Sequence, residues 1–148
     1  MPVSPSQTAE DYLERIHELI EEKGYARVVD IASSLKVRQA SVTSMVQKLG
    51  ELGYLNYEKY RGLILTDMGR EVACRIQRRH ETLSKFLSLF KIDGKTQLQD
   101  IEGIEHHLSN KTVNLLADLV HFFEERPKLL DDFQNSRPPQ AEERPKGP

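Results

Sequence analysis

The sequence predicts a mainly α-helical protein, in which an N-terminal winged helix-turn-helix is followed by an all-helical segment. Apolar residues recur at three- and four-residue spacing along most of the chain, which is the pattern of helices that bury one face. Residues 54–59 and 63–66 have the composition of strands and lie on either side of Gly62, so they predict one short β-hairpin. This hairpin follows two short helical patterns and precedes a long one, which places the winged helix first.

The composition is that of a globular protein with one domain or two small domains that share a core. The chain has 148 residues, 38% of them hydrophobic, and a net charge of −2. No run approaches the roughly 18–20 apolar residues of a membrane span, and residues 1–5 lack a signal-peptide pattern. The lone cysteine, Cys74, cannot form an internal disulfide, which favours a reducing compartment. We therefore expect a cytoplasmic protein with no membrane partner.

The first helix is expected over residues 6–23, with Gly24 as a left-handed cap. Its apolar residues share one face: Tyr12, Leu13, Ile16, Leu19 and Ile20. Asp11 and Glu14 lie three positions apart on another face. This pair suits either the positive end of the helix dipole or a metal ion.

A helix-turn-helix is expected next, with helices over residues 29–35 and 39–49 and a tight turn over 36–38. Hydrogen-bonding side chains lie near the start of the second helix, where a recognition helix meets DNA bases and phosphates: Arg38, Gln39, Ser41, Thr43, Ser44 and Lys48. Lys36 to Arg61 also holds five basic residues against two acidic ones, which suits a polyanion. An ordinary solvated helix face has a similar composition, so the prediction of DNA binding depends largely on the hairpin that follows.

The hairpin over residues 54–66 converts the helix-turn-helix into a winged helix. Tyr57, Lys59 and Arg61 lie at or near its tip and are predicted to contact phosphates or a minor groove.

A long helix is expected from Thr66 to about Phe90, and further helices over 96–108, 110–123 and 127–133. The long helix exceeds what one winged helix can bury, so its second half should belong to a different core. Residues 113–123 are apolar almost all round, which indicates burial on more than one side. A second copy of the chain would supply the missing cover, and we expect a symmetric homodimer.

Residues 100–108 predict a metal site, because two carboxylates and an imidazole are spaced to share one helix face. These are Glu102, Glu105 and His106, to which the chain can add Asp11 and Glu14 from the first helix and His80 from the long one. Four carboxylates and two imidazoles match two divalent cations of coordination number near six. Taken singly, each of these residues is better explained as an ordinary solvated side chain, and only their grouping favours a metal site.

Catalysis has little support in the sequence. It contains no HExxH motif, no nucleophile–base arrangement and no glycine-rich phosphate loop. A di-metal enzyme remains an alternative, although the paired Glu-x-x-His repeats typical of such enzymes are missing. A winged-helix regulator with an incidental carboxylate cluster is the other alternative.

The sequence resembles the diphtheria toxin repressor family, and most closely its manganese transport regulator branch. The similarity covers residues 6–135 and is carried by residues 57–62, His80-Glu81 and residues 102–107. The resemblance places the family's metal ligands on the same six positions: Asp11, Glu14, His80, Glu102, Glu105 and His106. Iron-responsive members have sulfur ligands at the positions of Asp11 and Glu105, so the carboxylates imply manganese. One departure is Gln39, where many relatives begin the recognition helix with proline.

The resemblance implies a manganese-dependent transcriptional repressor that binds palindromic, double-stranded operator DNA as a homodimer with two Mn²⁺ per subunit. Manganese uptake genes would be its targets, and no small-molecule substrate is expected. The corresponding domains are a DNA-binding domain over 1–70, a dimerisation and metal-binding domain over 71–136, and a disordered tail over 137–148. A repressor that responds to iron or another divalent metal, or a metal-independent regulator, is the alternative.

Overall fold

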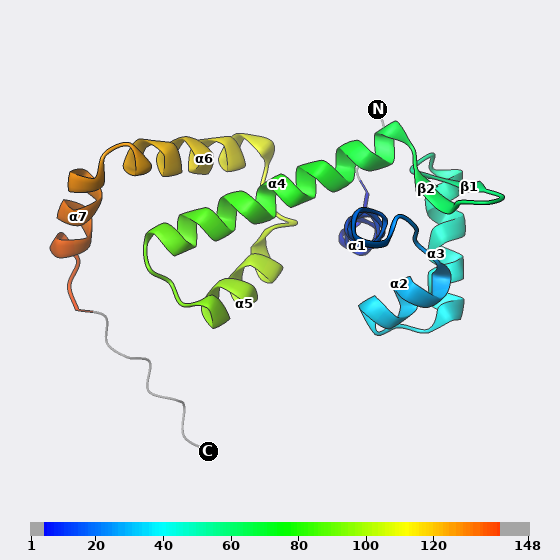
Figure 1. Cartoon of the computed structure of the whole chain (residues 1–148). Coiled ribbons are helices and arrows are strands. Elements are labelled where there is room, and N and C mark those ends of the chain that lie inside the picture. Colours follow the sequence, from blue (N-terminus) through cyan, green and yellow to red (C-terminus); the bar gives the residue numbers. More distant parts are fainter. Residues whose placement is uncertain (1–4, 140–148) are drawn as a thin grey trace, which may run out of the picture.

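The computed structural model describes residues 5–139, which form seven helices and one hairpin (Figure 1). The elements in chain order are α1 (Gln7–Lys23), α2 (Val28–Leu35), α3 (Gln39–Glu51), β1 (Leu55–Glu58), β2 (Gly62–Leu65), α4 (Asp67–Leu89), α5 (Gly94–Ile104), α6 (Asn110–Glu124) and α7 (Pro127–Ser136). Helix α4 runs from the winged helix at one end of the molecule to α6 and α7 at the other. The mainly helical prediction, with the winged helix first, is confirmed.

Helix α1 begins and ends at residues whose chemistry favours those positions. The Ser6 hydroxyl accepts a hydrogen bond from the Ala9 amide, and Gly24 adopts a left-handed conformation with φ of 82° and donates its amide hydrogen to the Ile20 carbonyl. The apolar face, which includes Leu13 and Ile16, is fully buried against the rest of the winged helix. The opposite face is left free for charged residues.

The winged helix contains the two helices and the hairpin that the sequence predicts. Lys36 takes a left-handed conformation that ends α2, and α3 begins three residues later. Strands β1 and β2 pair antiparallel in the register Leu55–Leu65 to Glu58–Gly62. Ala26, just before α2, forms an isolated bridge to Leu63, which ties the start of the helix-turn-helix to the wing.

Helix α4 joins the two halves of the molecule. The Thr66 hydroxyl caps it by accepting from the Gly69 amide and donates to the Gly53 carbonyl at 2.6 Å. Gly69 lies so close to the Tyr54 carbonyl that no Cβ would fit there without a shift. This close approach fixes the first turn of α4 against the residue that precedes β1.

The C-terminal helices flank α4, with α5 on one side and α6 on the other (Figure 1). Helix α5 begins at Gly94, where Asp93 caps it, and ends at Ile104 rather than continuing to residue 108. Helix α7 extends to Ser136, beyond the expected end at Phe133. At the far end of α4, Phe90 lies edge-on to both Phe123 and Phe133, at ring-centroid distances of 5.6 and 5.2 Å.

No helix within residues 5–139 is both long and apolar enough to cross a membrane. Of the expected disordered tail, residues 140–148 lie outside the part of the chain that is described.

Candidate metal centre and DNA-binding surface

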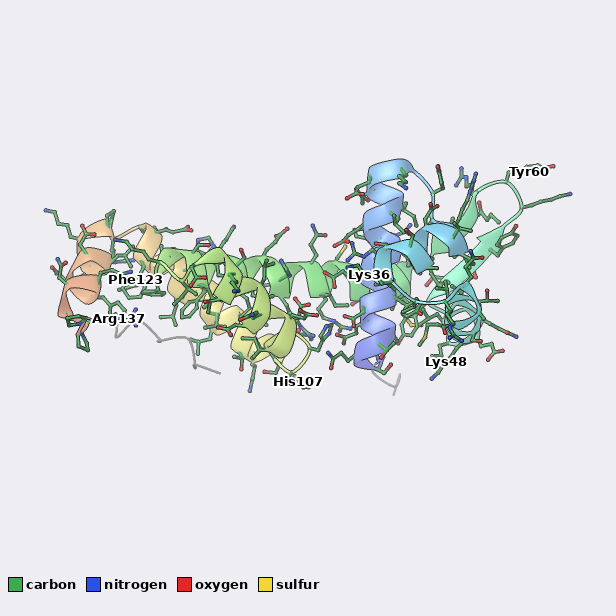
Figure 2. All side chains as sticks on the ribbon, turned by 90° about the horizontal axis from the view of Figure 1, so that it is seen from below. Lys36, Lys48, Tyr60, His107, Phe123 and Arg137 are labelled. Atoms are coloured by element: carbon green, nitrogen blue, oxygen red, sulfur yellow. The ribbon has the colours of Figure 1, made fainter. Side chains whose placement is uncertain are left out.

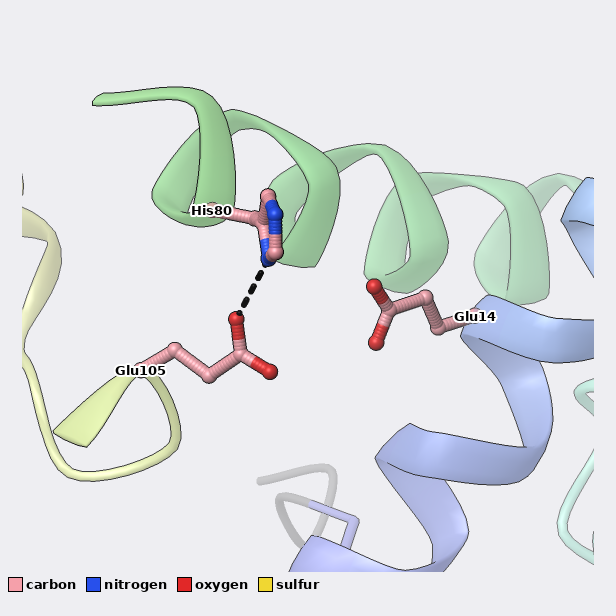
Figure 3. Close-up of side chains that lie close together, drawn as sticks. All are labelled: Glu14, His80 and Glu105. Atoms are coloured by element: carbon pink, nitrogen blue, oxygen red, sulfur yellow. Dashed lines mark hydrogen bonds and ion pairs between the residues drawn. The ribbon is translucent and has the colours of Figure 1, made fainter. Parts of the chain in front are cut away.

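Helices α1 and α4 and the residue that follows α5 bring three predicted ligands together. Ligand atoms of Glu14, His80 and Glu105 all lie within 4.8 Å of one another. Figure 3 shows the three side chains directed toward a common point, with His80 Nδ1 3.1 Å from Glu105 Oε2. Their positions are 14, 80 and 105, so the fold alone makes them neighbours.

A second group of ligands lies beside the first and shares Glu105 with it. His106 Nε2 is 2.9 Å from Asp11 Oδ1 and 3.5 Å from Glu105 Oε1. The His106 side chain is almost completely buried, at 4% exposure, whereas that of Asp11 is nearly half exposed. The two groups therefore form one continuous strip of oxygen and nitrogen donors along α1.

Glu102 is the sixth predicted ligand, and it is exposed rather than gathered with the others. It lines the same groove, of about 630 Å³, as the other five. The expectation that Glu102, Glu105 and His106 share the face of one helix is wrong. Glu105 is the C-cap of α5, and His106 follows in the turn, where the chain is no longer constrained to helical spacing.

Two carboxylates of the site, Glu14 and Asp11, have raised pKa values. Burial raises the pKa of Glu14 to about 7, and the nearby Glu105 and Glu18 charges add to the effect. The pKa of Asp11 is also raised, again chiefly by burial, although His106 opposes the shift. For His106 burial favours the neutral ring, but the hydrogen bond to Glu10 and the charges of Asp11, Glu10 and Glu105 outweigh it, so its pKa is raised.

These donors fit a hard divalent cation. A cation between Glu14 and Glu105 would offset both the burial of the Glu14 charge and its repulsion by Glu105, and imidazole nitrogen completes a mixed oxygen and nitrogen set. No cysteine lies among the residues that line the groove, so a thiolate site for a softer metal is not indicated there. The arrangement can hold one ion at Glu14, His80 and Glu105, and has room for further ligands beside it.

Two residues at the site, Glu10 and Arg79, were not among the predicted ligands. Glu10 is 9% exposed and accepts from His106, while Arg79 Nη1 lies 3.9 Å from Glu10 Oε2. Helical periodicity places Glu10 about 60° from Leu13 around α1 and therefore beside the buried face, which is a signal of burial available in the sequence. For Arg79 the sequence offers no comparable signal.

All nine residues predicted to contact DNA are exposed. Six lie at or on α3 and three on the wing. Figure 2 shows Lys48 and Tyr60 at this end of the molecule, away from His107. Helix α4 thus connects the winged helix, with its exposed polar surface, to the helical half that lines the metal groove. Helix α1 contacts both halves.

A winged helix joined to a helical half that gathers carboxylates and imidazoles defines a metal-responsive DNA-binding regulator. Comparison with known families agrees with this class. Residues 5–63 match the iron dependent repressor N-terminal DNA binding domain, and residues 66–133 match the iron dependent repressor metal binding and dimerisation domain. The chain belongs to this family, known also as the diphtheria toxin repressor family, and within it to the manganese transport regulator branch.

Curated relatives include the HTH-type transcriptional regulator MntR of Bacillus subtilis strain 168, which is 54% identical over 126 residues, covering 85% of this chain and 89% of the relative. MntR of Geobacillus kaustophilus strain HTA426 is 51% identical over 131 residues, covering 88% and 93%. These relatives are transcriptional regulators, and the chain is not an enzyme.

Solved structures agree with the fold. The metal-dependent transcriptional regulator MtsR superposes with a TM-score of 0.72 at 25% identity, covering 77% of this chain and 54% of that one. The manganese regulator SloR gives 0.68 at 27% identity, covering 81% and 55%. The chain thus spans about half the length of these two structures.

Proposed function

We propose that this protein is a manganese-dependent transcriptional repressor that binds palindromic operator DNA as a homodimer in the cytoplasm and controls manganese uptake genes. The observation that carries the proposal is the convergence of Glu14, His80 and Glu105. Glu14 lies on a helix of the DNA-binding part, and the other two lie on the helical half. A metal ion bound there would link the two.

Two Mn²⁺ ions per subunit are proposed. Glu14, His80 and Glu105 would hold one ion, and Asp11, His106 and Glu102 would hold the second. The 2.9 Å distance between His106 and Asp11 supports the second assignment. Glu102 would complete that position by turning inward from the exposed side of the groove. Such carboxylate-rich sets suit Mn²⁺, which prefers oxygen-rich coordination.

The proposed switch works through α1. Without metal, ionised Glu14 and Glu105 would repel each other, and α1 would be loosely held against the turn that follows α5. Glu14, His80 and Glu105 would hold a cation that offsets this repulsion and links α1 and α4 to the turn after α5, so that the two recognition helices of the dimer would keep the spacing of about 34 Å that successive major grooves require. Coupling of this kind is worth about 1–3 kcal/mol, or 5–150-fold in DNA affinity.

The proposed domains, 1–70 for DNA binding and 71–136 for metal binding and dimerisation, meet within α4. Helix α6 supports dimerisation because it is apolar on two sides. Val113 and Val120 are buried in the subunit, while Leu115, Leu119 and Phe122 form an exposed stripe at spacings of four and three residues. A second copy is the cover that we assign to this stripe.

The decisive experiment measures operator binding by the full chain after chelation, with and without Mn²⁺. Wild-type protein should bind 5–150-fold more tightly with the metal. Glu14→Gln should reduce this gain and lower the number of bound ions, because it removes a charged ligand. Glu22→Gln, an exposed change two turns further along α1, is the matched control and should behave as wild type. Equal DNA affinity of metal-free and Mn²⁺-loaded wild type would refute the proposal.

A further inference from the structure

We propose that Glu10 is a positioning residue that holds the His106 ring so that Nε2, and not Nδ1, faces the metal site. The inference rests on the proposed function of that site. His106 Nδ1 lies 2.8 Å from Glu10 Oε2, while Nε2 on the opposite edge of the ring lies 2.9 Å from Asp11 Oδ1. The ring is thus held between two carboxylates of α1 that are adjacent in sequence.

The chemistry of the contact determines which nitrogen carries hydrogen. An ionised carboxylate can only accept, so the bond to Glu10 requires Nδ1 to be the donor. Asp11 faces Nε2 at a similar distance and competes for the hydrogen; in the neutral ring in which Glu10 holds it on Nδ1, the lone pair belongs to Nε2. This atom also lies 3.5 Å from Glu105 Oε1, among the proposed ligands, so its lone pair is directed where a cation would be held. Metal-binding histidines commonly donate their other ring hydrogen to a carboxylate in this way.

Glu10 is itself fixed by the fold. Its side chain is 12% exposed, as is that of Arg79, whose Nη1 lies 3.9 Å from Glu10 Oε2. Arg79 Nη2 donates to Asn110 Oδ1 at 3.4 Å, which holds the guanidinium near the start of α6. A buried carboxylate requires a compensating charge or hydrogen bonds. Arg79 and His106 supply them, so Glu10 does not need a metal ion to balance it.

The contact joins three segments that meet only through folding: α1 through Glu10, α4 through Arg79 and the turn after α5 through His106. It follows that one part of the metal site is formed by hydrogen bonds before any metal arrives. The cluster at Glu14, by contrast, has two carboxylates facing each other. Glu10 therefore acts on the metal through His106 and has no place of its own among the ligands.

The test compares Glu10→Ala, Glu10→Gln and Glu22→Ala in the full-length chain, with circular dichroism as the check of folding. The first readout is the ¹⁵N chemical shifts of the His106 ring in metal-free protein, at a pH where the ring is neutral. Wild type should carry hydrogen on Nδ1. Glu10→Ala should populate the other tautomer, whereas Glu10→Gln keeps a neutral acceptor and should largely retain the wild-type form.

The second readout is Mn²⁺ affinity by calorimetry. Glu10→Ala should weaken binding at one of the positions about 10–100-fold, Glu10→Gln should be weakened less, and Glu22→Ala should not differ from wild type. An unchanged tautomer in Glu10→Ala overturns the proposal. If instead both Glu10 variants lose a bound ion while the tautomer stays as in wild type, Glu10 is a metal ligand and the proposal is also overturned. The tautomer is measured without metal or DNA. Failure of the proposed function is therefore a separate result, namely a wild-type DNA affinity that does not change when Mn²⁺ is added.

Discussion

The two halves of the molecule bury their apolar residues to different extents. Every member of the buried core cluster lies between Ala9 and Ile76. Beyond residue 76, within the described part of the chain, the buried hydrophobic residues are four: Leu83, Ile101, Val113 and Val120. The winged helix and the first turns of α4 thus share one core, whereas the helical half buries few apolar side chains; large hydrophobic residues are exposed in both halves. The helical half is therefore the part for which we propose cover by a second copy of the chain.

The largest effect is expected when the second copy is removed from the helical half. Leu115→Glu, in the exposed stripe of α6, should give a monomer, because a charge cannot be buried there without a partner. Loss of the paired contact with both half-sites should reduce operator affinity about 10²–10⁴-fold. Analytical ultracentrifugation and DNA titration measure the two effects. Val29→Glu, at an equally exposed apolar position on α2, should stay dimeric; a dimeric Leu115→Glu would place the interface elsewhere.

The core that the winged helix shares with α4 is tested by a pair of leucines near the end of α3. Leu49 is fully buried, whereas Leu52, three residues later, is 49% exposed. Leu49→Ala should lower the free energy of unfolding by about 2–5 kcal/mol, and Leu52→Ala by less than about 0.5 kcal/mol. Denaturant unfolding of the metal-free protein measures both. Similar losses in the two variants would contradict the burial described for this half.

The carboxylate that α1 contributes to the helical half should make metal binding depend on pH. With its pKa raised to about 7, Glu14 holds a proton at pH 6 that Mn²⁺ must displace. Affinity should therefore rise by up to about tenfold per pH unit below pH 7 and level off above it. The same shift means that the folded, metal-free protein binds this proton more tightly than the unfolded chain, so its stability falls as pH rises from about 4.5 toward 7.

Calorimetry of Mn²⁺ binding at pH 6, 7 and 8 measures this dependence. Glu14→Gln is the control, because the remaining titrating groups, Asp11 and His106, are unchanged in it. The difference between the two proteins isolates Glu14. Parallel pH profiles would show that Glu14 is already ionised at pH 6.

The smallest expected effect concerns the basic surface of the winged helix. Lys48→Ala and Arg61→Ala should each reduce the slope of log affinity against log salt by about one, since each removes one phosphate contact. Metal stoichiometry should not change. Arg61 lies 3.6 Å from Glu58, an exposed pair too weak to hold it from a phosphate. Lys95→Ala, on the exposed side of α5, is the control. An unchanged slope in both test variants would show that the DNA-binding surface lies elsewhere.

Much of the fold follows from local sequence signals. The caps at Ser6, Gly24 and Thr66 and the hairpin with Gly62 are each set by neighbouring residues, so their positions could be predicted closely. The end of α5 could not, because nothing in residues 105–108 forbids a helix: the chain turns there to bring Glu105 toward His80 and His106 toward α1. Tertiary contacts decided this boundary.

The candidate site was predictable in its ligand types and less so in its geometry. Counting carboxylates and imidazoles at helical spacing identifies six donors, but it treats them as equivalent. Folding makes them different: Glu105 is buried, Asp11 is nearly half exposed and Glu102 lies outside the cluster. Glu10 belongs to the same helix as two proposed ligands, yet its role depends on a contact with His106, 96 positions away, which no local pattern specifies.

Helix α1 has a consequence for how such proteins can be recombined. One of its faces builds the core of the winged helix, and another supplies Glu10, Asp11 and Glu14 to the metal groove. Deleting one residue from the middle of α1 would rotate the residues after it by about 100° around the helix axis. One face could then no longer pack in the core while the other lines the metal groove. Likewise, a chimaera joined at residue 66, between the two matched family segments, would take two proposed ligands from one parent and four from the other. The natural unit of exchange is therefore the whole chain from α1 to α6, although its sequence divides readily into two.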